Sequence, residues 1–289
     1  MENKEKNVDK ILGMNRTMFF VVIILLCVLS LSIGIYAQVF YRYSETDPFM
    51  LGIGVGRTQD AAEITKLKNE FNNIFTNDLE GNTSVSNINK EDTDRNIVYT
   101  LQTVTDQDED LYNISASIPT INIKSNEAQK INNEIKDKYL DKIEDIIDNA
   151  KEYTDYSVTY KAYMNGELLS LIIKETIREG RNVQSAKINT YNYDLNGNRQ
   201  VSIQDVINAK GYKNENLQKE IDAEIKELNA KDEELKNQYT EVKLRDLSSS
   251  IYKIENTENF IVNAQGYLYI IYAYGNTENT NKMDIIIFE

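Results

Sequence analysis

The sequence predicts an α+β protein: an N-terminal transmembrane helix, then an antiparallel sheet with two long amphipathic helices packed on it. Three observations predict this fold. Residues 18–37 form an uncharged, mostly apolar run. Several later segments alternate apolar and polar side chains, as β-strands do. Two further segments, near residues 126–150 and 214–239, repeat apolar side chains every three or four positions, which is the period of an amphipathic helix. Helices set between antiparallel strands are typical of α+β folds.

The apolar run is long enough to cross a membrane, because about 20 residues rising about 1.5 Å each span the hydrocarbon layer. Basic residues precede the run, whereas Glu45 and Asp47 follow it closely. This asymmetry predicts a single-pass protein of the cell membrane, with its N-terminus in the cytoplasm and its bulk outside. We therefore predict a cytoplasmic tail at residues 1–17, a transmembrane helix at 18–40 and a linker at 41–57.

A cleaved signal peptide is the alternative interpretation of the apolar run. The apolar core of a signal peptide normally has about 7–15 residues, and a small-residue A-x-A motif marks its cleavage site. The run here is longer, and Ile35-Tyr36-Ala37 matches that motif poorly. We therefore favour an uncleaved anchor, with cleavage near Ala37 as the other possibility.

The composition excludes several kinds of chemistry. The chain has 289 residues, no histidine and one cysteine, so a Ser-His-Asp triad, a His-ligated zinc ion and a disulfide framework are excluded. Its 46 acidic and 32 basic side chains give a formal charge of −14, which disfavours binding to nucleic acid. Residues 38–289 hold 43 of the acidic and 28 of the basic side chains, so the acidity lies outside the membrane. No catalytic residue and no cofactor are predicted.

The segments after the linker predict secondary structure in a definite order. Residues 58–96 are predicted to form a helical stalk followed by a polar loop. Strands are predicted near residues 97–101, 112–118, 156–164, 168–177, 186–193, 267–274 and 283–288, with Asn165-Gly166 as a hairpin turn. The first long helix has an apolar face of Ile131, Ile135, Ile143, Ile146, Ile147 and Ala150. Residues 97–289 are predicted to form one extracellular module in two halves, about 97–180 and 181–289.

Residues 194–205 resemble a calcium loop. Oxygen-bearing side chains fall at loop positions 1, 3, 5, 9 and 12, and they belong to Asp194, Asn196, Asn198, Ser202 and Asp205. This spacing suits Ca²⁺, which takes about six to eight oxygen ligands. However, Arg199 stands where the turn requires Gly, and the last ligand is Asp rather than a bidentate Glu. A hairpin turn followed by a short helix capped at Ser202 is the alternative, and no metal is the overall prediction.

Two acidic runs could supply the paired carboxylates of a cell-wall hydrolase. They are residues 106–110 and residues 232–234. Charge runs normally stay hydrated at the surface, so a solvated surface is the favoured interpretation of both. Most of the 19 tyrosines lie at strand positions, and an exposed subset could form a binding face because tyrosine is enriched in interfaces.

Three stretches resemble a known extracellular module. In residues 112–121 a strand ends in an Ile-Pro-x-Ile step and leads into a helix. In residues 190–207 a Tyr-Asn-Tyr-Asp strand precedes a turn and a short helix, and residues 259–288 resemble the closing strands. Residues 97–289 are thus similar to the module that lysozyme-responsive anti-sigma-V factors carry outside the membrane, and that precedes the catalytic domain of some peptidoglycan deacetylases. The resemblance implies an α+β sensor or binding domain in a Gram-positive cell envelope.

The sequence therefore predicts a non-catalytic extracellular domain that binds or senses a ligand. A basic protein such as lysozyme suits its acidic charge, and a cell-wall polymer is the other ligand class. An anti-sigma factor is the first alternative, although only residues 1–17 are available in the cytoplasm to hold a sigma factor. A cell-wall hydrolase that uses paired carboxylates is the second. The absence of histidine separates the chain from the deacetylases, whose metal site requires it.

Overall fold

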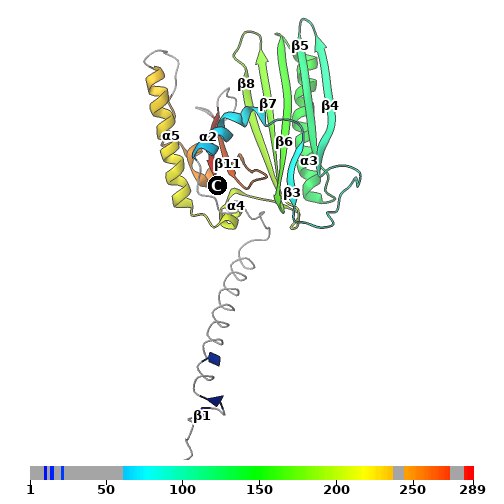
Figure 1. The fold of residues 1–289 in the computed structure, drawn as a ribbon. Helices are drawn as coiled ribbons and strands as arrows, with labels where there is room; N and C mark the ends of the chain where they lie inside the picture. The colour runs from blue at the N-terminus through cyan, green and yellow to red at the C-terminus, as the bar shows by residue number, and fades with distance from the viewer. Residues whose placement is uncertain (1–9, 12–13, 16–20, 23–60, 237–243, 274–282) are drawn as a thin grey trace, which may run out of the picture. The chain divides into compact units, whose positions relative to one another are not determined.

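The structure is a computed structural model, and it describes residues 10–11, 14–15, 21–22, 61–236, 244–273 and 283–289 (Figure 1). The chain divides into two units, Met1–Asp47 and Pro48–Glu289. In the first unit, β1 (Lys10–Ile11) pairs antiparallel with β2 (Met14–Asn15). All the other strands and helices described below belong to the second unit.

Most of the N-terminal predictions lie outside the described residues. This is true of the transmembrane helix at 18–40 apart from residues 21–22, of the linker at 41–57 and of the cleavage site near Ala37. No helix in the described part of the chain is both long enough and apolar enough to cross a bilayer. The membrane anchor stays a prediction from the sequence.

Seven strands of the second unit form one large sheet (Figure 1). Their order is β4-β5-β6-β7-β8-β9, and β3 pairs with the second half of β6. The strands are β3 (Leu79–Thr83), β4 (Val98–Asp108), β5 (Tyr112–Ile121), β6 (Thr154–Gly166), β7 (Leu168–Glu179), β8 (Ser185–Asp194) and β9 (Arg199–Gln200). The predicted hairpin at Asn165-Gly166 is confirmed, with Gly166 at φ +65°.

The large sheet is mixed, so the prediction of a purely antiparallel sheet is wrong. β5 and β3 both run parallel to β6. The reason for the first pairing is the helix between β5 and β6, which carries the chain back along the sheet so that both strands run in the same direction. The segment predicted as a polar loop supplies β3, which pairs through its backbone and therefore needs no apolar pattern of its own.

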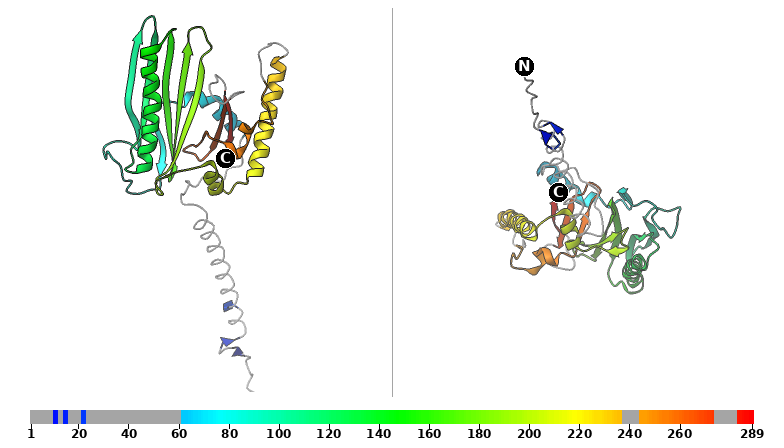
Figure 2. Two further views of the ribbon diagram at one scale, coloured as in Figure 1. Left: turned by 180° about the vertical axis from the view of Figure 1, so that it is seen from behind. Right: turned by 90° about the horizontal axis from the view of Figure 1, so that it is seen from below.

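The helix α3 (Asn126–Asn149) covers one face of the large sheet (Figure 2). It begins after Ser125, whose Oγ accepts a hydrogen bond from the backbone N–H of Ala128 at 3.0 Å. Its buried residues pack against apolar side chains of β5 to β8 in one core, and they are Ala128, Ile131, Ile135, Tyr139, Ile143 and Ile146. The prediction of this helix is confirmed, but Ile147 lies outside the core and is 37% exposed.

A smaller antiparallel sheet is formed by the last three strands. They are β10 (Phe260–Val262), β11 (Leu268–Ala273) and β12 (Met283–Phe288). The helices α4 (Ile203–Lys210) and α5 (Asn214–Lys236) share a core with this sheet, together with the short helices η2 (Ser250–Tyr252) and η3 (Ile254–Asn256). Each long helix therefore covers its own sheet, whereas the sequence predicted a single sheet for both.

A third core joins the two sheets. It contains residues of α2 (Ala61–Glu70) and η1 (Phe71–Asn73), with the fully buried Phe71 stacked on Tyr269 at 6.4 Å between ring centroids. A hydrogen bond also connects the two sheets: the backbone N–H of Val262 in β10 donates to Ser170 Oγ in β7 at 3.1 Å. Because β8 pairs with β7, the hydrogen bonds of the large sheet cross the division predicted near residue 180. The α+β fold is confirmed, and its two sheets form one continuous body within this unit.

Candidate binding surface

The candidate calcium ligands lie on the turn between β8 and β9 and at the start of α4. Asp194 ends β8 and is fully buried. Its Oδ1 accepts hydrogen bonds from the backbone N–H groups of Asn196 at 2.9 Å and Gly197 at 2.8 Å. Asn198 Oδ1 accepts a hydrogen bond from the hydroxyl of Tyr193 at 3.2 Å. These contacts close a hairpin turn.

Ser202 and Asp205 form a capping box at the start of α4. Ser202 Oγ accepts from the backbone N–H of Asp205 at 3.2 Å, and Asp205 Oδ2 accepts from the backbone N–H of Ser202 at 2.8 Å. Arg199 contacts both carboxylates of the region: its Nη1 lies 3.1 Å from Asp205, and its Nε lies 3.7 Å from Asp194. The turn and capped helix that were the alternative to a calcium loop are therefore present, and Arg199 supplies the positive charge between the two carboxylates.

The pKa of the Asp205 carboxyl lies below its ordinary value, because hydrogen bonds from Ser202 and Arg199 outweigh the opposing effect of burial. A carboxylate whose pKa is lowered by folding stabilises the fold fully when the pH is above its pKa in the unfolded chain. This stabilisation is lost as the pH falls through its lower pKa in the folded protein. We expect Asp205→Asn to lower the melting temperature at neutral pH. The difference in melting temperature between variant and wild type should narrow as the pH falls below 3.8, the ordinary pKa of an aspartate. Melting followed by circular dichroism across this pH range measures both effects.

The same melting experiment tests the calcium site, which stays a prediction. In the described part of the chain, no three acidic, histidine or cysteine side chains are grouped so that they could hold a metal ion. We expect millimolar calcium to leave the melting temperature unchanged. A rise that EDTA reverses, and that Asp194→Asn abolishes, would show that the loop rearranges to bind the ion.

The two acidic runs have different surroundings. Residues 106–110 complete β4 and its turn, where Asp108 Oδ1 accepts hydrogen bonds from the backbone N–H groups of Asp110 and Leu111. All the side chains of this run are exposed. In the second run Glu233 is exposed, but Asp232 is only 4% exposed. The prediction of a solvated surface fits the first run and fails for Asp232.

Asp232 belongs to a buried network centred on Arg245. Arg245 donates through Nε and Nη2 to Asp284, and through Nη1 to Asp232, with each distance 2.7 Å. Asn229 binds the backbone N–H and C=O of Arg245 at 2.8 Å each, and the hydroxyl of Tyr252 donates to Asp284 at 3.3 Å. The network ties α5 to β12. No local pattern predicts it, because Asp232 and Asp284 lie 13 and 39 residues from Arg245 in sequence.

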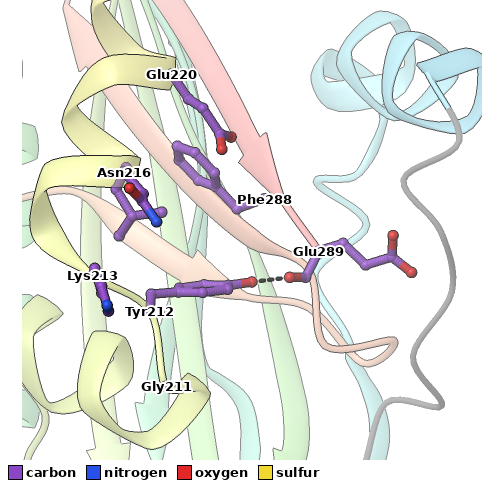
Figure 3. Close-up of a pocket in the computed structure, with 8 residues that line it drawn as sticks. Gly211, Tyr212, Lys213, Asn216, Glu220, Phe288 and Glu289 are labelled. Atoms are coloured by element: carbon purple, nitrogen blue, oxygen red, sulfur yellow. Dashed lines mark hydrogen bonds between the residues drawn. The ribbon is translucent and has the colours of Figure 1, made fainter.

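A small cavity lies where α5 meets the end of β12 (Figure 3). Its volume is about 250 Å³, and Tyr212, Lys213, Glu220 and Phe288 are among its lining residues. Tyr212 points across it and donates a hydrogen bond to the backbone C=O of Glu289 (Figure 3). Burial and the charges of Glu220 and Glu289 raise the pKa of Tyr212 to about 12. The cavity is smaller than the roughly 300–1,000 Å³ of most ligand pockets, so it suits at most a very small molecule.

Several exposed apolar side chains lie on the connections at one end of the large sheet, and this is the upper end of the sheet in Figure 1. The β4–β5 turn, the α3–β6 loop and the β7–β8 turn meet there. They are joined by hydrogen bonds from the N–H of Thr154 to the C=O of Leu111 at 2.9 Å, and from the N–H of Gly180 to the C=O of Tyr153 at 2.8 Å. We call this region the distal surface, and its exposed apolar side chains are Leu111 (39%), Ile147 (37%), Tyr153 (39%) and Val183 (74%).

Acidic side chains surround the distal surface. Residues 106–111, 145–155 and 178–184 together hold nine acidic and three basic side chains. Partial burial and the negative charges of Asp106 and Asp108 raise the pKa of Tyr112 above its usual value. The distal surface therefore combines exposed apolar side chains with an excess of negative charge.

Comparisons with known proteins do not place the chain in a family. No protein-family model matches the sequence, and no curated protein matches it. Two crystal structures of DUF3298 family proteins are similar to it. The one from Pseudomonas aeruginosa PAO1 has 12% identity and a TM-score of 0.41, covering 64% of this chain and 88% of that one. The one from Bacteroides fragilis NCTC 9343 has 15% identity and a TM-score of 0.35, covering 65% and 88%. Both structures are described only as members of this family, which is named for a domain of unknown function. Neither structure links the chain to anti-sigma-V factors or deacetylases.

Proposed function

We propose that this protein is a single-pass membrane protein of the Gram-positive cell envelope whose extracellular domain binds a basic protein and catalyses no reaction. The distal surface is the observation that carries this proposal. Exposed apolar side chains grouped within a polar surround mark sites of protein interaction. The acidic surround favours a basic partner, since complementary charge speeds association and rejects partners of like charge.

Other features support the location and the non-catalytic role. The apolar run at 18–37 and the charges on either side of it support an anchor with the domain outside. Within the two acidic runs, Asp108 closes a turn and Asp232 is neutralised by Arg245. The structural roles of these two carboxylates favour binding over hydrolysis. The resemblance of residues 97–289 to a lysozyme-responsive module makes lysozyme the first basic protein to test.

Full-length protein in lipid nanodiscs should bind lysozyme at low ionic strength, and the affinity should fall steeply as salt screens the acidic surround. We expect Tyr153→Ala to weaken binding about tenfold or more, because an aromatic side chain at the centre of an interface commonly contributes over 1 kcal/mol. Leu235→Ala is the control: Leu235 is another exposed apolar side chain, on α5, which contributes no residue to the distal surface. Calorimetry at two salt concentrations measures these affinities.

Two outcomes would contradict the proposal in different ways. If no heat of binding appears at low salt, lysozyme is not the partner. If Tyr153→Ala and Leu235→Ala bind equally well, the distal surface is not the site. Cytochrome c, a basic protein of unrelated shape, is the control for general charge attraction. If it binds as tightly as lysozyme, the binding is general attraction; if it binds much more weakly, the interface is specific.

A further inference from the structure

We propose that the face of the large sheet opposite α3 carries a second binding site, for an acidic polyol: a ligand with a carboxylate or phosphate group among hydroxyl groups. The site is a ledge formed by Lys174, Phe75, Thr159, Ser157 and Thr176. It goes beyond the function proposed above, because its ligand has the opposite charge and because it lies on the sheet face rather than at the sheet end.

Small hydroxyl side chains form the floor of the ledge. The strand register places one residue from each of five neighbouring strands in a row, and these are Thr105, Ser115, Ser157, Thr176 and Ala186. None of them is fully buried. The hydroxyls of Ser157 and Thr176 lie 2.7 Å apart and share a hydrogen bond. Thr159 and Lys174 pair in the next row. Because α3 lies on the other face (Figure 2) and these side chains are at least partly exposed, the hydroxyl groups of Thr105, Ser115, Ser157 and Thr176 are available to a ligand.

An aromatic side chain bounds the floor on the side of the third core. Phe75 follows η1 and packs edge to face against the buried Phe71, with 5.7 Å between ring centroids. The Nζ of Lys174 lies 5.0 Å from the centroid of the Phe75 ring. Phe75 is thereby held in position, and Lys174 lies where the polar floor meets the aromatic wall.

Lys174 is half-buried and contacts no carboxylate within the described residues. Lys161 points to the same face from β6, but its Nζ lies 2.7 Å from Asp78 and 3.2 Å from Glu80. The pKa values differ accordingly. Burial lowers the pKa of Lys174, whereas the two carboxylates raise the pKa of Lys161 above its usual value despite burial. The fold thus neutralises one lysine of this face and leaves the other for a counter-ion from outside.

The groups of the ledge match the parts of an acidic polyol. A carboxylate or phosphate oxygen would accept hydrogen bonds from the ammonium of Lys174. This interaction is strengthened because the ammonium is partly desolvated and has no carboxylate partner within the described residues. The hydroxyls of Thr159, Ser157 and Thr176 both donate and accept, so they can exchange hydrogen bonds with ligand hydroxyls. The Phe75 ring offers an apolar wall for the C–H groups of a sugar or polyol chain. The net charge of −14 opposes long polyanions, so a short segment is the expected occupant.

Lysine acylation read by mass spectrometry tests this site in the full-length protein in nanodiscs. Three probes are compared: a galacturonate oligomer, a glycerol phosphate oligomer and an uncharged maltooligosaccharide. At a concentration about ten times Kd the site is about nine-tenths occupied, so acylation of Lys174 should slow about tenfold. Lys219, exposed on α5, should react at the same rate with and without each probe. Protection by only one of the acidic probes would identify the anionic group that the site selects.

Variants separate ligand binding from general charge effects. We expect Lys174→Met to abolish binding of the protecting probe in calorimetry, and Thr176→Val, which keeps the shape but removes the hydroxyl, to weaken it several-fold. Lys219→Met removes the same charge elsewhere and should have no effect. Lysozyme binding should survive Lys174→Met, so failure of this site and failure of the proposed function are distinguishable. The proposal is overturned if neither acidic probe protects Lys174 at low salt, or if the uncharged probe protects it equally.

Discussion

Arg245→Ala should lower the free energy of unfolding by about 3–5 kcal/mol, the usual cost of breaking a buried ion pair. The guanidinium neutralises Asp232 and Asp284, and each is nearly inaccessible to solvent. Without Arg245 the two carboxylates would stay buried without a counter-charge. The link between α5 and β12 would be lost as well. Urea denaturation of the full-length protein, followed by circular dichroism, measures the change.

The control for this prediction lies next to Asp232 on the same helix. Glu233 is exposed, so Glu233→Ala should change stability by no more than about 0.5 kcal/mol. Replacing Arg245, Asp232 and Asp284 together with apolar residues of similar volume should cost much less than Arg245→Ala alone, because no charge is left buried. An Arg245→Ala variant within about 1 kcal/mol of wild type would show that water reaches the network and that it does not hold α5 in place.

Ile135→Ala should destabilise the protein by about 2–5 kcal/mol, because it removes apolar atoms and leaves a cavity in a core that collapses only partly. Ile135 is fully buried between α3 and the large sheet. Ile147→Ala makes the same substitution on the same helix, but Ile147 is 37% exposed, so its cost should be below about 1 kcal/mol. Urea denaturation of both variants compares the two sites directly.

Equal losses for Ile135→Ala and Ile147→Ala would contradict the packing of α3. They would mean that the helix is rotated, or that Ile147 is covered by another part of the chain. Because Ile147 belongs to the distal surface, Ile147→Ala should weaken lysozyme binding while stability changes little. One variant therefore reports on the core and on the proposed interface at the same time.

Local sequence patterns predicted the elements whose stability depends on neighbouring residues. The apolar period of α3 and the turn at Asn165-Gly166 each involve residues that are close in sequence. The capped helix after Ser202 was also foreseen, as the alternative to a calcium loop. In each of these cases the period or the turn chemistry is the physical cause of the element.

Other features depended on residues that are distant in sequence. β3 pairs with β6 although its own sequence, Leu-Glu-Gly-Asn-Thr, has no strand pattern, because its partner supplies the backbone hydrogen bonds. The buried Asp232 looked like part of a charged surface, since its neighbours Glu233 and Glu234 are exposed. Arg245 explains its burial, and no local rule connects the two residues.

The sequence by itself determined the composition limits, the long apolar run, the two amphipathic helices and most of the strands. Only the tertiary structure decided that the strands form two sheets, that Ile147 turns outward while Ile146 is buried, and that three separate connections meet at the distal surface. It also decided that Lys161 has carboxylate partners while Lys174 has an aromatic ring. The physical reason is that periodicity records which side of an element is apolar, whereas burial and charge neutralisation depend on which elements come to lie next to each other.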